Sequence, residues 1–287
     1  MLSTKVKMRI ARALNHAVVG GRRMLGGDGI VLARRRGVKW HFDLNEGVDL
    51  ALYLGLYQGL PRRAFDNWIR PGSLVIDIGA NIGAHCLPMA RHVGPAGRVI
   101  AIEPTGYAFS KLVENVSLNP DLATQLISVQ AALTREAISD SKPAAFFSRW
   151  PVHDNGKPRH AEHLGQLEPA NAARFLSLDQ LLSELRADRR VSGLVAFVKL
   201  DVDGNELDVL QGGKHVFTID RPPLLIEIAP HVQDEVPQRF EALIGTLDSY
   251  RYRLEDAVSG QPIAMSAAVL RSHIKYGAGV DIIACPA

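Results

Sequence analysis

Cysteine is scarce in this sequence, with Cys86 and Cys285 the only thiols among 287 residues. Two cysteines in apolar surroundings are too few for a disulfide framework or a cysteine-ligated zinc cluster, so a reducing compartment is the natural expectation. Long apolar runs are also missing, and no stretch of about 18 uncharged apolar residues could span a membrane. The basic N-terminus has its apolar part interrupted by Arg12 and His16, which disfavours a cleaved signal peptide. We expect a cytoplasmic location, with peripheral contact to a membrane left open.

The composition excludes wholesale disorder. Hydrophobic residues make up 47% of the chain and charged residues 22%, which is enough apolar material for a sizeable core. The sequence contains no internal repeat and no low-complexity tract. Its length accommodates one large domain, or one domain with an appendage.

Acidic residues are almost absent from the first 39 positions. This segment holds ten lysines and arginines against the single acid Asp28, a formal charge of +9, whereas the remaining residues carry −6. The net charge of +3 therefore conceals a basic arm attached to an acidic body. Packing on the core or in a homo-oligomer, binding of an anionic acceptor, and contact with an anionic membrane surface all remain open for the arm. Nucleic acid is not expected as a partner, because the body is acidic and no aromatic–basic RNA motif occurs.

The spacing of apolar residues divides the chain near residue 65. The first part predicts a helix that stops at Gly20-Gly21, then short strands, then a second helical stretch: residues 4–19, 30–42 and 47–69. We expect residues 1–65 to form a basic N-terminal extension that packs on the core. The core is expected to comprise residues 66–287.

Apolar runs and helical segments alternate along this second part. Strands are predicted at 74–78, 99–102, 126–130, 195–200, 224–228, 252–255 and 280–284, and helices at 83–92, 106–118, 177–187, 204–211 and 236–249. Such alternation predicts an α/β fold with a mostly parallel, seven-stranded twisted sheet and helices on both faces. Ligands of such folds bind where the parallel strands end. The polar segment 135–175 interrupts the alternation, and we interpret it as an insertion on the acceptor side.

The turn after the first core strand reads Gly79-x-Asn81-x-Gly83 and is preceded by Asp77. Glycines allow a sharp turn and a close approach of the backbone to a ligand. A dinucleotide site would have the spacing G-x-G-x-x-G, and its diphosphate would be repelled by a neighbouring aspartate. The turn therefore favours a ligand that carries a positive charge.

The second core strand ends in Glu103-Pro104. An acid at this position can accept hydrogen bonds from both hydroxyls of an adenosine ribose. Together with Asp77, it favours S-adenosylmethionine over a nicotinamide dinucleotide. A NAD-dependent oxidoreductase and a cofactor-binding scaffold without activity remain as alternatives.

A series of segments in a fixed order resembles the FkbM family of Rossmann-like, S-adenosylmethionine-dependent methyltransferases. These segments are 75–83 (VIDIGANIG), 97–104 (GRVIAIEP), 112–119 (LVENVSLN), 131–133 (AAL), 176–179 (LSLD), 198–206 (VKLDVDGNE), 209–213 (VLQGG) and 225–228 (LIEI). The resemblance covers about residues 70–230 and implies methylation of hydroxyl oxygens on sugars, glycans or secondary metabolites. The chain departs from the family at Asp203, where glutamate is usual.

The resemblance also implies which residues hold the cofactor. Its methionine and ribose would lie against the first turn, its ribose hydroxyls against the acid that ends the second strand, and its adenine beside Gln130 and the two residues that follow. The implied cofactor-binding residues are Asp77, Gly79, Ala80, Asn81, Gly83, Glu103, Pro104, Ala131, Ala132 and Asp201.

Transfer of a methyl group to a hydroxyl requires positioning of the acceptor and removal of its proton. Asp201, at the end of the fourth core strand, is our first candidate for the base or for a residue that orients the acceptor. His231 is the second, because an unperturbed imidazole titrates near neutrality. Lys199 is a third catalytic candidate, although it is equally interpreted as a paired charge at a strand end.

The carboxylates near the fourth strand also invite a metal hypothesis. Asp201, Asp203 and Glu227 offer the oxygen ligands that Mg²⁺ prefers. Glu206, by contrast, is expected to begin a helix, where an acid interacts favourably with the helix dipole.

Two sets of ring side chains stand in the polar segment. The histidines His153, His160 and His163 are expected to be solvated rather than metal-bound. The aromatic residues Phe146, Phe147 and Trp150 are expected either to stack on the acceptor or to form a small satellite core.

Overall fold

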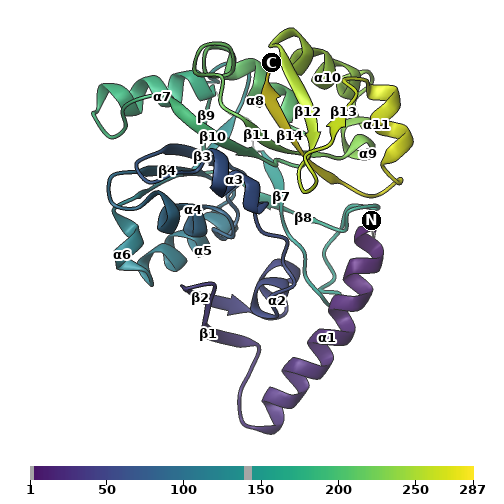
Figure 1. The fold of residues 1–287 in the computed structure, drawn as a ribbon. Coiled ribbons are helices and arrows are strands. Elements are labelled where there is room, and N and C mark those ends of the chain that lie inside the picture. Colours follow the sequence, from purple (N-terminus) through teal and green to yellow (C-terminus); the bar gives the residue numbers. More distant parts are fainter. Residues whose placement is uncertain (1–2, 139–143) are drawn as a thin grey trace.

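The computed structural model describes residues 3–138 and 144–287. Within them, the main sheet has eight strands in the order β13-β12-β14-β11-β10-β3-β4-β5 (Figure 1). The strands are β3 (Leu74–Ile78), β4 (Arg98–Ile102), β5 (Leu126–Val129), β10 (Val195–Leu200), β11 (Leu224–Ile228), β12 (Tyr252–Asp256), β13 (Pro262–Ile263) and β14 (Val280–Pro286). Neighbours from β5 to β11 are parallel, and β14, β12 and β13 are added antiparallel. The mostly parallel sheet is confirmed, and the short β13 was not predicted.

Helices cover both faces of this sheet (Figure 1). One face carries α4 (Cys86–Val93), α5 (Gly106–Ser117) and α6 (Pro120–Ala123), and the other carries α7 (Leu178–Ala187), α8 (Glu206–Gly212), α10 (Arg239–Ser249) and α11 (Ala267–His273). Alternate residues of β3 belong to different cores: Ile76 packs with α7, α8 and α10, and Val75 packs with α4. Because both faces are covered, every position of β3 is buried, which explains why four of its five residues are apolar, with Asp77 the exception.

The N-terminal part contains α1 (Thr4–Met24), β1 (Ile30–Arg35), β2 (Val38–Asp43), α2 (Gly47–Tyr53) and α3 (Arg62–Asn67). The predicted stop at Gly20-Gly21 is wrong, because α1 continues through both glycines. A glycine inside a helix costs about 1 kcal/mol, and the helix ends only before Gly26, whose φ is +78°. The single helix predicted for 47–69 is also wrong, since Gly55 (φ +72°) and Pro61 separate α2 from α3.

The polar segment contains strands that were not predicted. The strand β7 (Ala145–Arg149) pairs antiparallel with β8 (Gln166–Pro169), and β6 (Ala131–Leu133) pairs in parallel with β9 (Arg174–Leu176). Residues 139–143 of the predicted insertion lie outside the described residues. The remaining elements are the π-helix η1 (Val216–Asp220) and α9 (Pro230–Gln233). No helix in the described ranges combines the length and the apolar character needed to cross a membrane.

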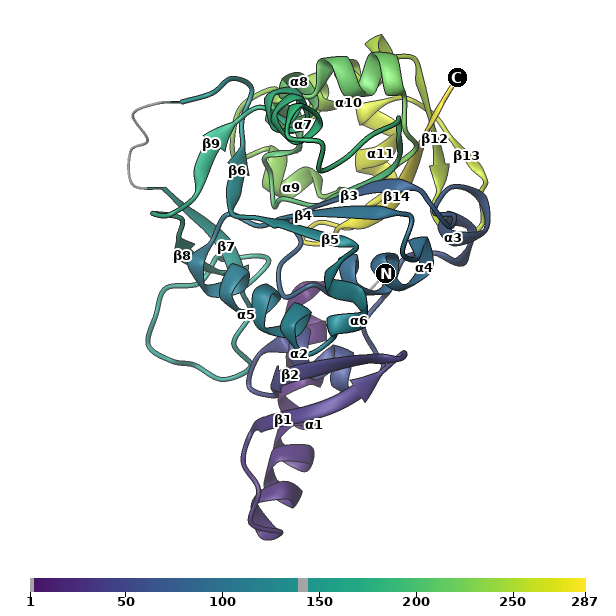
Figure 2. The ribbon, with the colours of Figure 1, turned by 90° about the vertical axis from the view of Figure 1, so that its left-hand side faces the viewer.

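The N-terminal hairpin of β1 and β2 lies below α5 and α6 in Figure 2, and two asparagines of the α5 region attach it to the core. Asn115 accepts a hydrogen bond from the His41 N–H (2.9 Å) and donates one to the Ile82 carbonyl oxygen (3.0 Å). Asn119 accepts from the Lys39 N–H (2.9 Å) and donates to the Lys39 carbonyl oxygen (2.7 Å). The side chains thus take the place of a neighbouring strand at the edge of β2.

We expect Asn119→Ala to lower the free energy of unfolding by about 1–3 kcal/mol, because it leaves backbone groups of Lys39 without partners in a partly buried position. Urea denaturation followed by circular dichroism measures this change. The control Asn171→Ala alters an exposed turn and should change the value by less than about 0.5 kcal/mol. Equal effects of the two substitutions would contradict the role of Asn119 in holding the hairpin against the core.

Candidate active site

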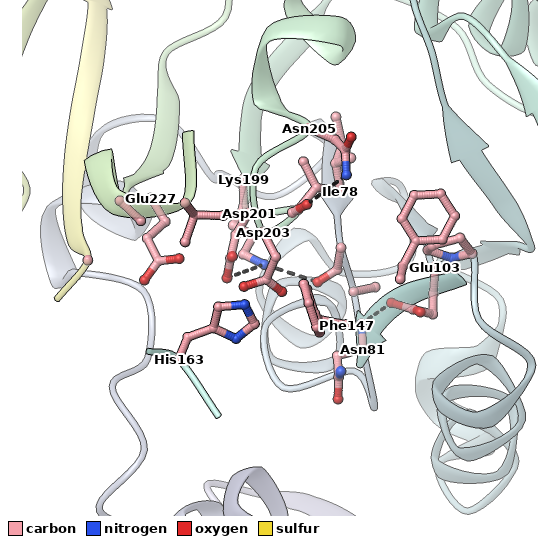
Figure 3. A pocket seen from close by; sticks show the side chains of 18 of the residues that line it. Ile78, Asn81, Glu103, Phe147, His163, Lys199, Asp201, Asp203, Asn205 and Glu227 are labelled. Carbon is pink, nitrogen blue, oxygen red and sulfur yellow. Dashed lines mark hydrogen bonds and ion pairs between the residues drawn. The ribbon is translucent and has the colours of Figure 1, made fainter. Parts of the chain in front are cut away.

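A cavity of about 310 Å³ opens where β3, β4, β10 and β11 end (Figure 3). Of the residues expected to hold the cofactor, those that line it are Gly79, Ala80, Asn81, Glu103, Pro104, Ala131, Ala132 and Asp201. Asp77 is fully buried beneath the turn. Gly83 faces inward, where an added Cβ would press on Leu112 and Leu87. The structure thus brings most of the expected residues to one cavity and places these two behind its wall.

Position 79 requires a glycine because the main chain of Asp201 lies too close to leave room for a Cβ. The φ of Gly79 is +79°, and a Cβ at this position would overlap the carbonyl oxygen of Asp201. The main chain of the turn after β3 therefore lies directly against the main chain at the end of β10. Any larger residue would push the two cavity walls apart.

Glu103 holds the turn from the neighbouring strand. One carboxylate oxygen accepts from the Asn81 N–H (3.0 Å), and the other accepts from the N–H (3.0 Å) and hydroxyl (2.7 Å) of Thr105. Burial raises the pKa of Glu103, and these hydrogen bonds oppose the shift. Asn81 also donates to the Ser148 carbonyl oxygen at 3.0 Å. The turn is thereby tied to β7 of the inserted segment.

The ammonium group of Lys199 lies at the centre of the acidic side of the cavity. It donates to the Gly79 carbonyl oxygen at 3.1 Å and lies 3.2 Å from an Asp201 carboxylate oxygen and 3.7 Å from Asp77. Burial opposes its charge, but Asp201 and Asp77 outweigh burial and raise the pKa of Lys199. Burial in turn raises the pKa of Asp77, with Lys199 counteracting. The contacts of Lys199 are those of a paired strand-end charge.

Three carboxyl groups gather beside this lysine. Oxygen atoms of Asp201, Asp203 and Glu227 lie within 4.8 Å of one another, and Figure 3 shows the three side chains converging. Burial first, and then the negative charge of Asp201, raise the pKa of Asp203 and of Glu227 well above the usual range. Asp281 lies opposite Glu227 on β14, and burial with the Asp201 charge raises its pKa to about 6. The cluster can bind an organic cation, a metal ion, or a ligand that donates hydrogen bonds, such as one with hydroxyl groups.

Glu206 has a structural role. It begins α8, as predicted. Its carboxylate accepts from the Val202 N–H (3.0 Å) and the Gly204 N–H (3.1 Å), and also from the Gln233 amide. These bonds hold the turn that carries Asp203, whose φ is +47°.

The three histidines of the inserted segment have different environments. His163 is buried, so the expectation of a solvated side chain is wrong for it; its ring stacks on His160 with centroids 3.9 Å apart. Burial lowers the pKa of His163 to about 3, so the ring is neutral at physiological pH. Its Nε2 has no hydrogen-bond partner among the described residues and its side chain lines the cavity (Figure 3). His153 is bonded to Asn15 at 2.6 Å, away from this cavity.

The other cavity wall contains His231 and the aromatic side chains. His231 lines the cavity, burial lowers its pKa, and neither ring nitrogen has a partner within the described parts. Phe146, Phe147 and Trp150 line it too. Trp150 donates from its indole nitrogen to the His163 carbonyl oxygen at 3.0 Å. These aromatic residues therefore present ring surface to a ligand while packing on their own segment.

A second cavity of about 370 Å³ adjoins the first. The two share Lys199, Asp201 and Glu227 as lining residues, and the second extends to α1 and α2. Sequence reasoning missed Tyr57, His85 and Asp281, which line it. The Tyr57 hydroxyl lies 3.3 Å from His85 Nε2, and burial lowers the pKa of His85 to about 3. No spacing in the sequence indicates that these residues meet.

Comparison with known proteins agrees with this geometry. Residues 77–254, more than half of the chain, match the methyltransferase FkbM domain. The chain belongs to the FkbM methyltransferase family. The matched region runs from β3 to β12. It therefore contains the carboxylate cluster of Asp201, Asp203 and Glu227, whereas Asp281 lies beyond it.

Similarity to individual proteins is more limited. A 74-residue segment is 36% identical to an arsenite methyltransferase of Halobacterium salinarum; it covers 26% of this chain and 17% of that protein. The FkbM methyltransferase structure from Methylobacillus flagellatus is 17% identical, with 75% of this chain and 44% of that chain covered and a TM-score of 0.42. Fibrillarin from Aeropyrum pernix, solved with bound S-adenosyl-L-methionine, is 15% identical, with 89% and 81% covered and a TM-score of 0.39.

The need for a glycine at position 79 of this FkbM domain can be tested by substitution. We expect Gly79→Ala to reduce stability more than Gly72→Ala, because both positions have similar positive φ values (+79° and +85°) but only Gly79 lacks space for a Cβ. The conformation alone costs about 1–3 kcal/mol, and the overlap with Asp201 adds to it. Urea denaturation of both variants gives the comparison. An equal loss would show that main-chain contact does not constrain the turn.

Proposed function

We propose that this chain is an S-adenosylmethionine-dependent O-methyltransferase that acts on a hydroxyl group of a sugar, glycan or secondary metabolite. The observation that carries the proposal is the layout of the first cavity. It has a buried carboxylate, Glu103, beside a tight glycine turn and an acidic cluster around Asp201. The family match supports methyl transfer, and the chemistry of the lining residues supports the donor and the type of acceptor.

The cavity fits the donor in three respects. Glu103 has a buried carboxylate suited to ribose hydroxyls, the turn at Gly79 gives close access to main-chain atoms, and the nearby carboxylates favour a cationic ligand. When bound, S-adenosylmethionine supplies an electrophilic methyl group on a positively charged sulfur. A diphosphate would instead meet Asp201 and Asp203, which disfavours a nicotinamide dinucleotide.

Asp201 is placed to orient the acceptor and to accept its proton. It lines both cavities, and the paired ammonium of Lys199 holds one of its oxygens at 3.2 Å. Its side chain is 35% exposed, so its other oxygen has access to a ligand. His231 is the second candidate base, since it lines the first cavity as a neutral ring.

The second cavity supports a polyhydroxylated acceptor. Its polar side chains include Tyr57, Gln58 and Asp281 beside the carboxylates, and Trp150 offers a ring face. Carboxylate and amide groups bind sugar hydroxyls, and an aromatic ring packs on a sugar face. A strongly anionic group in this cavity would be repelled by Asp201 and by Asp281, whose carboxyl is ionised above about pH 6.

Calorimetry tests the donor. We expect S-adenosylmethionine to bind and NAD not to bind, and Glu103→Gln to weaken S-adenosylmethionine binding at least about tenfold, because it removes a charged hydrogen-bond acceptor. The control Glu136→Gln alters an exposed side chain and should leave the affinity unchanged. Binding of NAD without binding of S-adenosylmethionine would refute the proposal.

A screen of sugars, nucleotide sugars and metabolites with labelled methyl donor identifies the acceptor, and Asp201→Asn then tests the mechanism. We expect turnover at saturating donor to fall by about 100-fold or more, as for loss of a general base. The matched control is Asp121→Asn in the exposed start of α6. Unchanged turnover in Asp201→Asn would remove Asp201 from the mechanism.

The same assay separates direct catalysis by the carboxylates from catalysis through a divalent ion. Asp201, Asp203 and Glu227 can supply oxygen ligands to Mg²⁺, but Lys199 already provides a cationic partner to Asp201. We therefore expect turnover to be insensitive to a chelator. Loss of turnover that added Mg²⁺ restores would assign the cluster to a metal ion instead.

A further inference from the structure

The distal end of α1 and the turn into β1 project from the body of the molecule (Figures 1 and 2). We call this part, residues 22–32, the basic tip. Two large apolar side chains are almost fully exposed there, Met24 at 89% and Leu25 at 90%, and Leu32 on β1 is 70% exposed. Two arginines, Arg22 and Arg23, immediately precede them. Exposed apolar side chains of this size at a projecting turn indicate a contact surface.

An ordered turn holds these side chains outward. The Leu25 and Gly27 N–H groups donate to the Arg22 carbonyl oxygen at 3.0 and 2.9 Å, and the Gly26 N–H donates to Arg23 at 3.1 Å. The Arg22 side chain then bonds the Asp28 carbonyl oxygen at 2.9 Å. The tip is thus a closed helix end, and Met24 and Leu25 have no neighbouring surface to fold onto.

The basic tip carries a net positive charge, since it contains Arg22 and Arg23 against the single acid Asp28. Of the ten basic residues among positions 1–39, Lys5 alone lies within 4.0 Å of a carboxylate in the described part of the chain, at 2.9 Å from Glu162. At the tip itself, the Arg22 guanidinium bonds a main-chain oxygen, that of Asp28, rather than a carboxylate. The positive charges of Arg22 and Arg23 therefore remain available to an anionic partner at the tip.

We propose that the basic tip binds an anionic lipid surface, with Met24 and Leu25 inserted among the headgroups and the neighbouring arginines at the phosphates. Apolar side chains flanked by cations combine the two contributions that bind proteins to such surfaces. A stable protein interface buries about 1,200–2,000 Å², whereas the tip offers a narrow projecting turn. A lipid surface accepts such a turn without requiring a matching shape.

The proposal gives α1 two functional ends. Thr4 and Lys7 at its beginning line both cavities, and Met24 at its end carries the tip. A helix of 21 residues is about 30 Å long. A surface bound at the tip would therefore leave the cavities open to an acceptor.

Cosedimentation with vesicles tests the proposal independently of catalysis. The full chain is mixed with vesicles of phosphatidylcholine alone or with added phosphatidylglycerol. We expect binding to the anionic vesicles only, weakened by salt, and at least about tenfold weaker for the double variant Met24→Ser/Leu25→Ser. The control Val258→Ser/Tyr276→Ser removes comparably exposed side chains elsewhere (76% and 78%) and should bind as the unmodified chain does.

Three results would overturn the proposal. The first is no binding to anionic vesicles, and the second is equal binding by the tip variant and the control variant. The third is a dimer, detected by light scattering without lipid, that the tip variant dissociates, since that would assign the tip to a second copy of the chain. Because all substituted side chains are exposed, circular dichroism should show every variant folded.

Discussion

The buried ammonium of Lys199 is the interaction on which the rest of the site depends. It bonds the Gly79 carbonyl oxygen and pairs with Asp201, so it joins the end of β3 to the end of β10. The carboxyl groups beside it are partly or fully removed from water, and a cation at this position offsets both their desolvation and their repulsion. Gly79 adds to the constraint, because only a residue without Cβ lets the turn touch Asp201. The donor turn and the proposed catalytic carboxylate are thereby fixed relative to each other.

The second cavity, the proposed acceptor site, is built partly from a helix outside the family match. Asn15 of α1 donates to the Leu44 carbonyl oxygen at 2.7 Å and is bonded to His153 at 2.6 Å, and Arg12 donates to the Val152 carbonyl oxygen at 3.0 Å. These bonds connect α1 to the hairpin and to the inserted segment. The basic arm therefore contributes a wall to the second cavity, while the far end of α1 projects outward. The basic arm is thus attached to the acidic body through the hydrogen bonds of Arg12 and Asn15.

Much of the fold could be predicted because buried parallel strands need apolar runs, such as residues 99–102 of β4, and because glycines mark the first turn. The features that were wrongly predicted or missed depend on tertiary contacts, which the spacing of residues along the sequence does not reveal. Gly20-Gly21 lie in a helix that tertiary bonds hold together, and β7 and β8 pair across the intervening inserted segment. His163 looked solvated because its neighbours in sequence are polar, but its ring packs on His160 and Phe147. The candidate cofactor residues were predicted from local motifs, whereas the acceptor residues come from distant elements.

The central claim is that one buried cation holds together a cluster of carboxylates. The most direct test compares the unfolding free energy of Lys199→Met and of the control Lys214→Met, an exposed position, across pH. Without the ammonium, Asp77 loses the positive charge that offsets its burial, so its pKa should rise further in the folded state. Stability should then fall as the pH rises from the unfolded to the folded pKa of Asp77. We expect Lys199→Met to lose about 3–5 kcal/mol at about pH 8 and distinctly less at about pH 5. A loss that is the same at both pH values, or no loss, would contradict the account.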